Sequence, residues 1–413
     1  MNWKPLTRIA FRFSFAYLGL YILATQIAGS LFYFPYLPFR GLGPLWPMRD
    51  VTVWIAVHVF HINTPLVFTG DSIGETAFFW VQAFWILVAA IAATFIWSAL
   101  DKRRRNYAAL HSWFRLFIRL ALAAQMFEYG MTKVIPNQFR APPLITLTQP
   151  VGHQTLEGIL WASIGASLAY QIFLGCAEML GGILLLFPRT TLLGALICLA
   201  DLTQVFVLNM TYDIGLKQIS FHLILLSVFL IAPDFRRLCN FFFLNREAIP
   251  SSAPSANRIA LALGIYLIGA QAFVNVKYWQ TSGGGSSRSA LYGIWNVNEL
   301  SVDGQTRPAI LNDYDRQWRR IIFDAPGTIA FQRTDDSIAH YGVSIDSYRN
   351  SLALTKGGSR NWNSSFAFER PADDQLILDG EMDSHHIRMR LQRVELDSFP
   401  LRSSSFRWVR PNP

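Results

Sequence analysis

Two apolar stretches decide the fold class: SLAYQIFLGCAEMLGGILLLF (167–187) and TLLGALICLADLTQVFVLNMT (191–211). Each is close to the roughly 20 residues that a helix needs to cross the hydrocarbon core of a bilayer. Each also has a carboxylate near its midpoint, Glu178 in the first and Asp201 in the second. An ionisable side chain at that depth is costly unless it is paired or reaches water, and it usually serves a function. The two stretches therefore predict a membrane protein with an internal polar site.

Composition and charge support a membrane protein and exclude a nucleic-acid-binding one. Of the 413 residues, 52% are hydrophobic and only 15% are charged, and the formal net charge is +9. Residues 281–413 hold 16 basic and 16 acidic side chains, whereas residues 1–280 hold 20 and 11. The surplus flanks apolar segments, as in cytoplasmic loops, and does not form one basic face. Its main members are Lys4, Arg8, Arg12, Lys102, Arg103, Arg104, Arg105, Arg236, Arg237, Arg246 and Arg258.

Seven segments are long and apolar enough to predict membrane spans. With the N-terminus in the cytoplasm, every strongly basic connection lies on the cytoplasmic side, and residues 278–413 lie outside it. The first segment lacks a small-residue cleavage site at its end, so we expect it to be retained as a span. The predicted spans are 9–29, 77–99, 113–135, 167–187, 191–211, 217–234 and 257–277.

Two long connections lie on the predicted external side. Residues 30–76 begin with a series of aromatic residues and prolines, and they contain the apolar segment Val51–Phe60, which is too short to span. We expect that segment to be an interfacial or re-entrant helix. The second connection, 136–166, holds four prolines and a possible short helix from Leu156. Both connections are expected to cap the helical bundle from outside.

A Gly/Ser linker at 279–287 predicts a domain boundary, after which the pattern changes from helical to short alternating runs. Eight consecutive short strands favour an up-and-down barrel or a sandwich. The region 288–413 has no cysteine, because Cys176, Cys198 and Cys239 all precede it. Its expected strands are 291–302, 317–324, 327–333, 338–346, 350–356, 363–369, 374–382 and 385–394.

The β domain resembles the lipocalin and wider calycin barrels on two positions. Gly293-Ile294-Trp295 stands at the start of the first expected strand, and Arg393 stands on the last. In those barrels a G-x-W tryptophan is covered by an arginine from the final strand. The resemblance implies that the Arg393 guanidinium closes the barrel floor by a cation–π contact with Trp295. The alternative is an unrelated β domain in which Trp295 is a core residue.

Residues 113–236 resemble the four-helix DoxX membrane family. The resemblance rests on Arg115 and Arg119 at the start of a span, on Tyr129-Gly130-x-x-Lys133, and on Glu178-x-x-Gly181-Gly182-x-Leu184-Leu185. It implies a bacterial inner-membrane protein and, from one branch of that family, quinone-linked oxidation. The insertion at 136–166, two extra N-terminal spans and a seventh span all depart from the family's short form. The predicted organisation is 1–112 (two spans and an external loop), 113–278 (DoxX-like core and seventh span), 279–287 (linker) and 288–413 (extracytoplasmic β domain).

The candidate site residues are polar side chains on apolar spans. Glu178, Asp201 and His222 are the candidate catalytic residues, because protonatable groups could serve the carbonyl oxygens of a quinone. The candidate substrate-binding residues are Glu128, Lys133, Gln204 and Gln218.

Span directions place Glu128, Lys133, Gln218 and His222 in the outer halves of their helices, so the polar site is expected to open outward. Asp201, Gln204 and Asn209 are expected to lie close to one helical face.

Each candidate also has a structural interpretation. Lys133 near a span end is typical of a snorkelling anchor. Gln204 and Asn209 could only join helices by hydrogen bonds. Glu178 could pair with Lys133, Arg119 or another basic group, Asp201 could be structural in the same way, and His222 could be a satisfied polar side chain. The sequence does not indicate a metal site, because His58 and His61 lack a carboxylate at ligand spacing. It also has no glycine-rich loop of the kind that binds nucleotides.

Three functions therefore stay open at this stage. The first is a quinone-linked redox subunit in the inner membrane, with membrane quinone as the cofactor and a partner subunit in a complex. The second is binding and handover of a lipid or other amphiphile, with the β domain as the acceptor. The third is a non-catalytic scaffold of a membrane complex. The lipid bilayer is a partner in all three.

Overall fold

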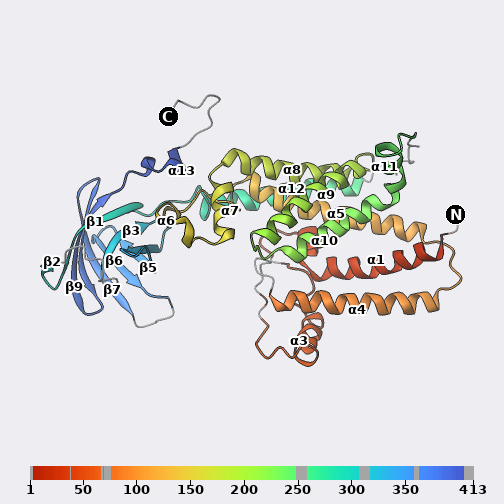
Figure 1. Cartoon of the computed structure of the whole chain (residues 1–413), viewed down its shortest axis with the longest axis horizontal. Helices are drawn as coiled ribbons and strands as arrows, with labels where there is room; N and C mark the ends of the chain where they lie inside the picture. The colour runs from red at the N-terminus through yellow and green to blue at the C-terminus, as the bar shows by residue number, and fades with distance from the viewer. Residues whose placement is uncertain are drawn as a thin grey trace. The chain divides into compact units, whose positions relative to one another are not determined.

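The computed structural model describes residues 3–37, 39–66, 68, 76–247, 258–306, 317–357 and 362–403. It divides into two compact units (Figure 1). The helical unit comprises Met1–Gln138 and Ala169–Trp279, and the barrel unit comprises Phe139–Leu168 and Gln280–Pro413. Each unit has its own apolar core.

Within the described part of the helical unit, six helices are long and apolar enough to cross a membrane. The predicted span 113–135 corresponds to α5, which has 27 residues but also carries several charged side chains, so it is not one of the six. Membrane-length helices run side by side in Figure 1. The helices are α1 (Pro5–Ala24), α2 (Gln26–Leu31), α3 (Met48–His58), α4 (Ala77–Leu100), α5 (Ala108–Val134), α8 (Leu168–Leu186), α9 (Thr191–Thr211), α10 (Lys217–Ile231), η2 (Ala232–Asp234), α11 (Phe235–Phe242) and α12 (Arg258–Thr281).

Helix α5 lies inside the helical unit. Seven consecutive residues, Ala121–Phe127, are all buried, which means that this part of the helix is covered on every face. A helix surrounded by other helices can hold charged side chains that an outer, lipid-facing helix cannot. This position explains why the most polar of the long helices is compatible with an otherwise apolar bundle.

The predicted first span, 9–29, is not one continuous helix. Helix α1 ends at Ala24 and α2 begins at Gln26, because Thr25 has extended backbone angles. The Thr25 hydroxyl donates a hydrogen bond to the carbonyl of Tyr21, and the backbone N–H of Gly43 bonds the carbonyl of Ala24. The returning loop therefore satisfies backbone groups that the break sets free.

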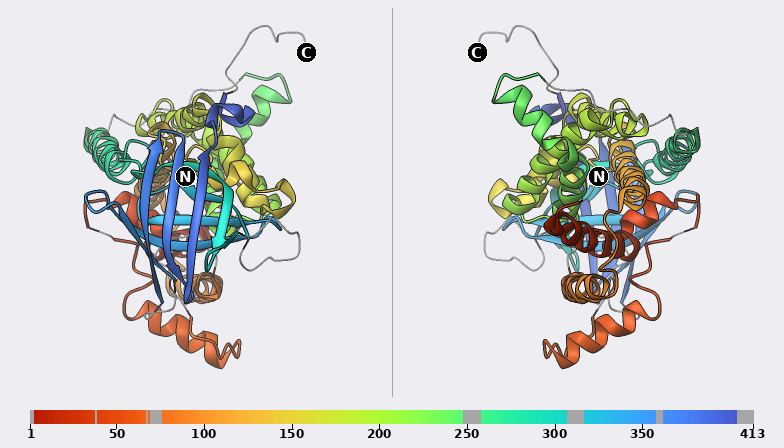
Figure 2. Two further views of the ribbon diagram at one scale, coloured as in Figure 1. Left: turned by 90° about the vertical axis from the view of Figure 1, so that its left-hand side faces the viewer. Right: turned by 90° about the vertical axis from the view of Figure 1, so that its right-hand side faces the viewer.

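Helix α3 runs across the direction of the long helices and lies beside α4. Its ribbon is seen end-on in Figure 1 and lengthwise in Figure 2. The indole of Trp85 on α4 donates a hydrogen bond to the hydroxyl of Thr52 on α3. The predicted short helix Val51–Phe60 is therefore present as Met48–His58, and its direction is that expected of an interfacial helix if the long helices span a membrane.

The barrel unit contains a closed, antiparallel, eight-stranded barrel, as the sequence predicted. The long strands pair in chain order, and β1 also pairs with β9, which closes the sheet. The two-residue strand β2 extends β1 and is not one of the eight. The strands are β1 (Gly293–Val302), β2 (Gln305–Thr306), β3 (Trp318–Phe323), β4 (Thr328–Arg333), β5 (Ile338–Asp346), β6 (Ser351–Thr355), β7 (Asn363–Ala372), β8 (Gln375–Met382) and β9 (His385–Arg393).

Apolar side chains fill the interior of the barrel. Residues on strands such as β7 and β9 alternate between buried and exposed, and inward-facing apolar residues from all eight strands form one cluster. An eight-stranded barrel is just wide enough for side chains to fill it. Large members of the cluster include Trp295, Phe323, Phe331 and Phe366.

The expected pairing of Trp295 with Arg393 is present, but the expected contact between them differs. The two residues face each other across β1 and β9. However, the Arg393 guanidinium donates a hydrogen bond to the carbonyl of Tyr292, and the Trp295 indole donates one to the carbonyl of Leu291. Among the contacts described for these two residues, there is no cation–π contact between the Arg393 guanidinium and the Trp295 ring.

The insertion predicted at 136–166 belongs mainly to the barrel unit, which includes Phe139–Leu168. It was expected to cap the helical bundle. Instead, Leu144 packs on the outer face of the barrel against Ile294, Ile322 and Ala330. The insertion contains α6 (Leu144–Thr148), η1 (Val151–His153) and α7 (Leu156–Gly165), and the chain after β9 contains η3 (Leu396–Ser398) and α13 (Pro400–Ser403).

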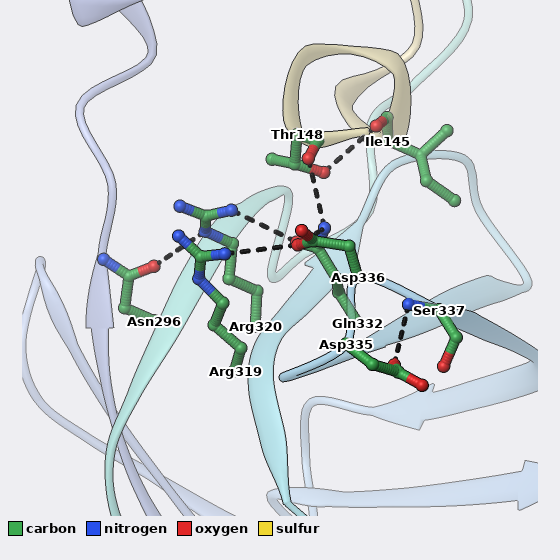
Figure 3. Close-up of polar contacts among 9 residues, drawn as sticks. All are labelled: Ile145, Thr148, Asn296, Arg319, Arg320, Gln332, Asp335, Asp336 and Ser337. Atoms are coloured by element: carbon green, nitrogen blue, oxygen red, sulfur yellow. Dashed lines mark hydrogen bonds and ion pairs between the residues drawn. The ribbon is translucent and has the colours of Figure 1, made fainter. Parts of the chain in front are cut away.

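Gln332 is the central residue of the polar contacts between the insertion and the barrel (Figure 3). Its side chain is 0% exposed. The amide Nε2 donates hydrogen bonds to the Thr148 carbonyl (3.1 Å) and to Asp336 Oδ1 (3.0 Å), and Oε1 accepts one from Arg320 Nη1 (3.2 Å). Nearby, the backbone N–H of Leu144 bonds Asp324, and burial raises the pKa of that carboxyl. One amide thus connects α6 with β3 and β4.

We expect Gln332→Ala to release α6 from the barrel, because three hydrogen bonds are lost and their partners are only partly exposed to water. A cost of about 1–3 kcal/mol is typical of such a loss. The measurement is the rate of proteolytic cleavage within 139–168 in the purified protein. Gln392→Ala is the matched control, because Gln392 makes a single exposed bond to Asp374. Equal cleavage rates in the two variants would contradict the role given to Gln332.

Candidate functional site

Helices α5 and α8 approach each other closely at two glycines. A Cβ atom on Gly175 would lie 2.6 Å from the carbonyl oxygen of Gly130 and 2.8 Å from Lys133 Cβ. A Cβ on Gly130 would lie 2.8 Å from the carbonyl oxygen of Gly175. Small residues allow helices in bilayers to pack backbone to backbone in this way. The close crossing brings the side chains that follow these glycines into direct contact.

Lys133 and Glu178 form a buried ion pair at this crossing. The Lys133 ammonium lies 2.7 Å from both carboxylate oxygens of Glu178. Their side chains are only 8% and 3% exposed. Of the partners that the sequence left open for Glu178, the structure selects Lys133, whereas Arg119 lies 3.4 Å from the Thr191 hydroxyl. The two side chains depend strongly on each other, because the attraction between them offsets the desolvation free energy of each buried charge.

Asp201 on α9 is a second carboxylate near this pair. It is close enough to interact electrostatically with Glu178 and Lys133. Its Oδ2 atom is buried and has no hydrogen-bond partner among the residues that the structure describes. Two of the predicted catalytic residues, Glu178 and Asp201, therefore both lie within electrostatic range of the Lys133 ammonium, which is bonded to Glu178.

Glu128, a predicted substrate-binding residue, lies five residues before Lys133 on α5 and has different partners. Its carboxylate accepts a hydrogen bond from the Ser30 hydroxyl of α2 and one from Gln125 Nε2 (3.5 Å). Ser30 also lies 3.0 Å from Gln125 Oε1. Neutral donors hold this carboxylate in place, in contrast to the lysine at Glu178.

The Glu128 carboxylate lines a pocket of about 330 Å³, which we call the Glu128 pocket. Arg40 lines the same pocket and interacts electrostatically with Glu128. Burial and the charge of Glu128 raise the pKa of Tyr33 to about 12. The pocket combines two opposite charges with apolar rings, and its lining residues are Gln26, Gly29, Ser30, Tyr33, Phe34, Tyr36, Leu37, Phe39, Arg40 and Glu128.

Gln26 and Tyr129 connect the Glu128 pocket with the ion pair. The Gln26 amide donates a hydrogen bond to the Tyr129 hydroxyl (2.6 Å). The Tyr129 carbonyl accepts one from Lys133 (3.3 Å), whose ammonium also lies 5.7 Å from the Tyr129 ring centre. A smaller cavity of about 40 Å³ shares Gln26 and Arg40 with the pocket and is also lined by Gln218. Gln218, another predicted substrate-binding residue, therefore lies next to the same polar region.

His222 is held by two hydrogen bonds and a ring contact. Its Nδ1 lies 2.7 Å from the carbonyl of Gln218, which can only accept, so Nδ1 carries the hydrogen. In the neutral ring, Nε2 then accepts from the Tyr17 hydroxyl (2.8 Å). The Tyr21 ring is stacked on the imidazole at 3.5 Å. The contacts of His222 are thus with α1 and with its own helix, whereas Glu178 bonds α5. The interpretation of His222 as a satisfied polar side chain agrees with these contacts.

The expected common face of Asp201, Gln204 and Asn209 is not formed. Gln204 is exposed on the outside of the helical unit, whereas Asn209 is buried. At 3.6 residues per turn, positions 204 and 209 differ by roughly 140°. Asn209 donates to the Leu216 carbonyl and the Ser220 hydroxyl, so it fixes the turn between α9 and α10.

Four residues of the polar region were not among the sequence candidates: Gln26, Ser30, Arg40 and Tyr129. Gln26 and Ser30 are polar side chains four residues apart at the end of an apolar segment, a helical spacing that could have identified them. Arg40 gives no such signal, because the returning loop brings it to the pocket. Metal chemistry has no candidate, since the described residues hold no group of three potential ligands.

Fold and site together define a class: a helical bundle of membrane-crossing length that carries an amphipathic pocket, joined to a closed β barrel. The chain belongs to the same family as the uncharacterized protein YwoB of Bacillus subtilis (strain 168). The two are 34% identical over 125 residues, which are 30% of this chain and 79% of YwoB. No family model and no solved structure matches the chain. The DoxX and lipocalin resemblances therefore stay predictions from the sequence.

Proposed function

We propose that the protein is a multi-pass membrane protein that binds the head group of an amphiphilic molecule in the Glu128 pocket. The observation that carries this proposal is the pocket itself, in which a carboxylate and a guanidinium lie among aromatic rings. Its volume lies within the range of about 300–1,000 Å³ that is typical of small-molecule sites. Charged groups inside a bundle of apolar helices are costly, and a polar ligand is a common reason to keep them.

The exposed aromatic residues at the pocket support an amphiphile over a fully water-soluble ligand. Phe34, Tyr36 and Leu37 line the pocket and are exposed. Phe34 and Tyr36 also contact Tyr266 and Phe273 on α12. Aromatic side chains of this kind are favoured at the level of lipid head groups, where one part of a ligand is wet and the other apolar. We therefore infer that the apolar part of the ligand lies along these rings.

The filled interior of the barrel argues for the helical unit as the binding element. A handover function with the barrel as acceptor was one expectation from the sequence. That function needs internal space, whereas the barrel interior is occupied by the apolar cluster that includes Trp295, Phe331 and Phe366.

A membrane quinone is the second candidate ligand, and the rings of the pocket favour it specifically. A flat quinone ring could lie among Tyr33, Phe34 and Phe39, with donors such as Ser30 close to its carbonyl oxygens. In this version Glu128, not Glu178, is the nearest carboxyl group to the ligand. A redox function then requires a partner subunit, as the sequence also led us to expect.

Glu128→Gln should remove the ligand while leaving the fold intact, because glutamine keeps the shape and still accepts from Ser30. Loss of a charged hydrogen bond weakens binding by about tenfold or more. The measurement is mass spectrometry and absorbance of an organic extract of the purified protein, which separate lipid from quinone. Glu247→Gln is the control, because Glu247 is exposed in the same unit and lines no part of the pocket. An extract that is identical for Glu128→Gln and the control would sink the proposal.

A further inference from the structure

The Glu128 pocket presents two opposite charges to one small volume. Glu128 and Arg40 both line this pocket and attract each other electrostatically. A ligand with a single charge would satisfy one of them and repel the other. A ligand with both charges can place its positive group at Glu128 and its negative group at Arg40. The attraction between the two side chains is then replaced by two attractions to the ligand, so the pocket favours a ligand of this kind.

The surroundings of each charge indicate which part of the ligand it takes. Glu128 is held by Ser30 and Gln125 in a partly buried position, with Tyr33 and Phe34 in the same pocket. A carboxylate beside aromatic faces is the chemistry that recognises an ammonium group, through charge and cation–π contacts. Arg40 is exposed, and its planar guanidinium matches a phosphate.

We propose that the Glu128 pocket binds a zwitterionic head group, with its ammonium at Glu128 and its phosphate at Arg40. This inference rests on the proposed function and names the class of its ligand. Two sources share this chemistry: a phospholipid whose head group carries an amine, and the free phosphorylated amine. The exposed rings of Phe34 and Tyr36 favour the lipid, because they give its acyl chains an apolar surface at the pocket.

The test compares three short-chain lipids on the full-length protein in detergent after removal of bound lipid. Dioctanoyl phosphatidylethanolamine carries both charges, dioctanoyl phosphatidylglycerol carries only the phosphate, and dioctanoyl glycerol carries neither. Native mass spectrometry measures the fraction bound at each concentration. We expect the zwitterionic lipid to bind at least about tenfold more tightly than the other two, a ratio that corresponds to one charged contact. This comparison uses the unmodified protein, so it does not depend on whether a variant folds.

Two variants then assign the ends of the ligand. Glu128→Gln should weaken binding of the zwitterionic lipid by about tenfold, and it should not weaken binding of phosphatidylglycerol, whose phosphate the carboxylate repels. Arg40→Gln should weaken binding of both phospholipids. Arg49→Gln is the matched control, because Arg49 is exposed on α3 and does not line the pocket. Soluble phosphoethanolamine added as a competitor identifies the source. If phosphoethanolamine displaces the lipid at a concentration similar to that of the lipid, the free phosphorylated amine is the ligand. If displacement needs a far higher concentration, the lipid is the ligand.

The outcomes separate this inference from the function on which it rests. If the two phospholipids bind with equal affinity and Glu128→Gln abolishes binding of both, the preference for a zwitterionic head group is wrong. The pocket would still be an amphiphile site. Binding of every lipid that is insensitive to both Glu128→Gln and Arg40→Gln would overturn the site as well. Tighter binding of the glycerol lipid than of either phospholipid would overturn the role of both charges.

Discussion

Glu178→Gln is expected to lower the free energy of unfolding by roughly 3–5 kcal/mol, the usual cost of stranding one member of a buried ion pair. The variant leaves the Lys133 ammonium, which is 2.7 Å from both carboxylate oxygens, in a site where its own side chain is 8% exposed. Lys133→Met should cost a similar amount, because it strands Glu178. The measurement is reversible unfolding of the purified protein in mixed detergent, with helix content as the signal.

The double variant Lys133→Met/Glu178→Gln should recover much of this loss. When both charges are removed, no isolated charge stays buried, and such replacements are often neutral or stabilising. The four proteins form a cycle that isolates the energy of the pair. Additive losses in the double variant would mean that the two side chains act independently, in conflict with the geometry of the crossing.

Lys217 provides a matched control for Lys133. It also lies 2.7 Å from a carboxylate, that of Asp213, but Asp213 is 87% exposed. Solvent screens this pair, so Lys217→Met should cost less than about 1 kcal/mol. If Lys133→Met cost no more than Lys217→Met, burial would not be what gives the Lys133–Glu178 pair its strength.

Asp201 should behave differently from Glu178. Its Oδ2 atom has no hydrogen-bond partner among the described residues, so Asp201→Asn removes a buried charge without breaking a direct bond at that atom. Asp201 also interacts electrostatically with Lys133, and it could compensate part of the charge of that lysine in Glu178→Gln. Glu178→Gln should therefore lower the free energy of unfolding by more in a protein that already carries Asp201→Asn than in the unmodified protein.

The positions of the long helices could be predicted from the sequence, because bilayer-length apolar stretches have few alternative structures. The pairing of Glu178 could not. Lys133 and Arg119 are both basic residues on the same predicted span, and only the crossing of Gly130 and Gly175 decides between them. A contact between residues 45 positions apart depends on how two helices cross, which their apolar patterns do not specify.

The pocket was missed for a similar reason. Glu128 was predicted as a binding residue from its own span, but Arg40 reaches it through a loop whose path depends on the break at Thr25. In the barrel, alternation predicted the strands within a few residues. The covering of Ile294 and Ile322 by the insertion was not predictable, because the five residues of α6 are too few to show a helical period.

The barrel core supplies the second large expected effect. Trp295→Ala should destabilise the barrel unit by about 3–5 kcal/mol, the usual cost of truncating a large buried aromatic side chain. Trp295 is 1% exposed and lies in the cluster that fills the barrel. Its indole also bonds the carbonyl of Leu291 (3.0 Å), which loses its partner in the variant. The measurement is hydrogen exchange of strand amides in the full-length protein, which reports the free energy of opening for each strand.

Trp362→Ala separates burial from the loss of an indole hydrogen bond. Trp362 also donates from its indole, to Asp383 Oδ1 at 2.7 Å, but it is only partly buried at the edge of the cluster. We expect it to cost about 1 kcal/mol, close to the net value of one hydrogen bond. Because β1 pairs with both β3 and β9, Trp295→Ala should accelerate exchange in all three strands together. Acceleration confined to β1, or equal effects of the two variants, would mean that Trp295 does not hold the closed barrel together.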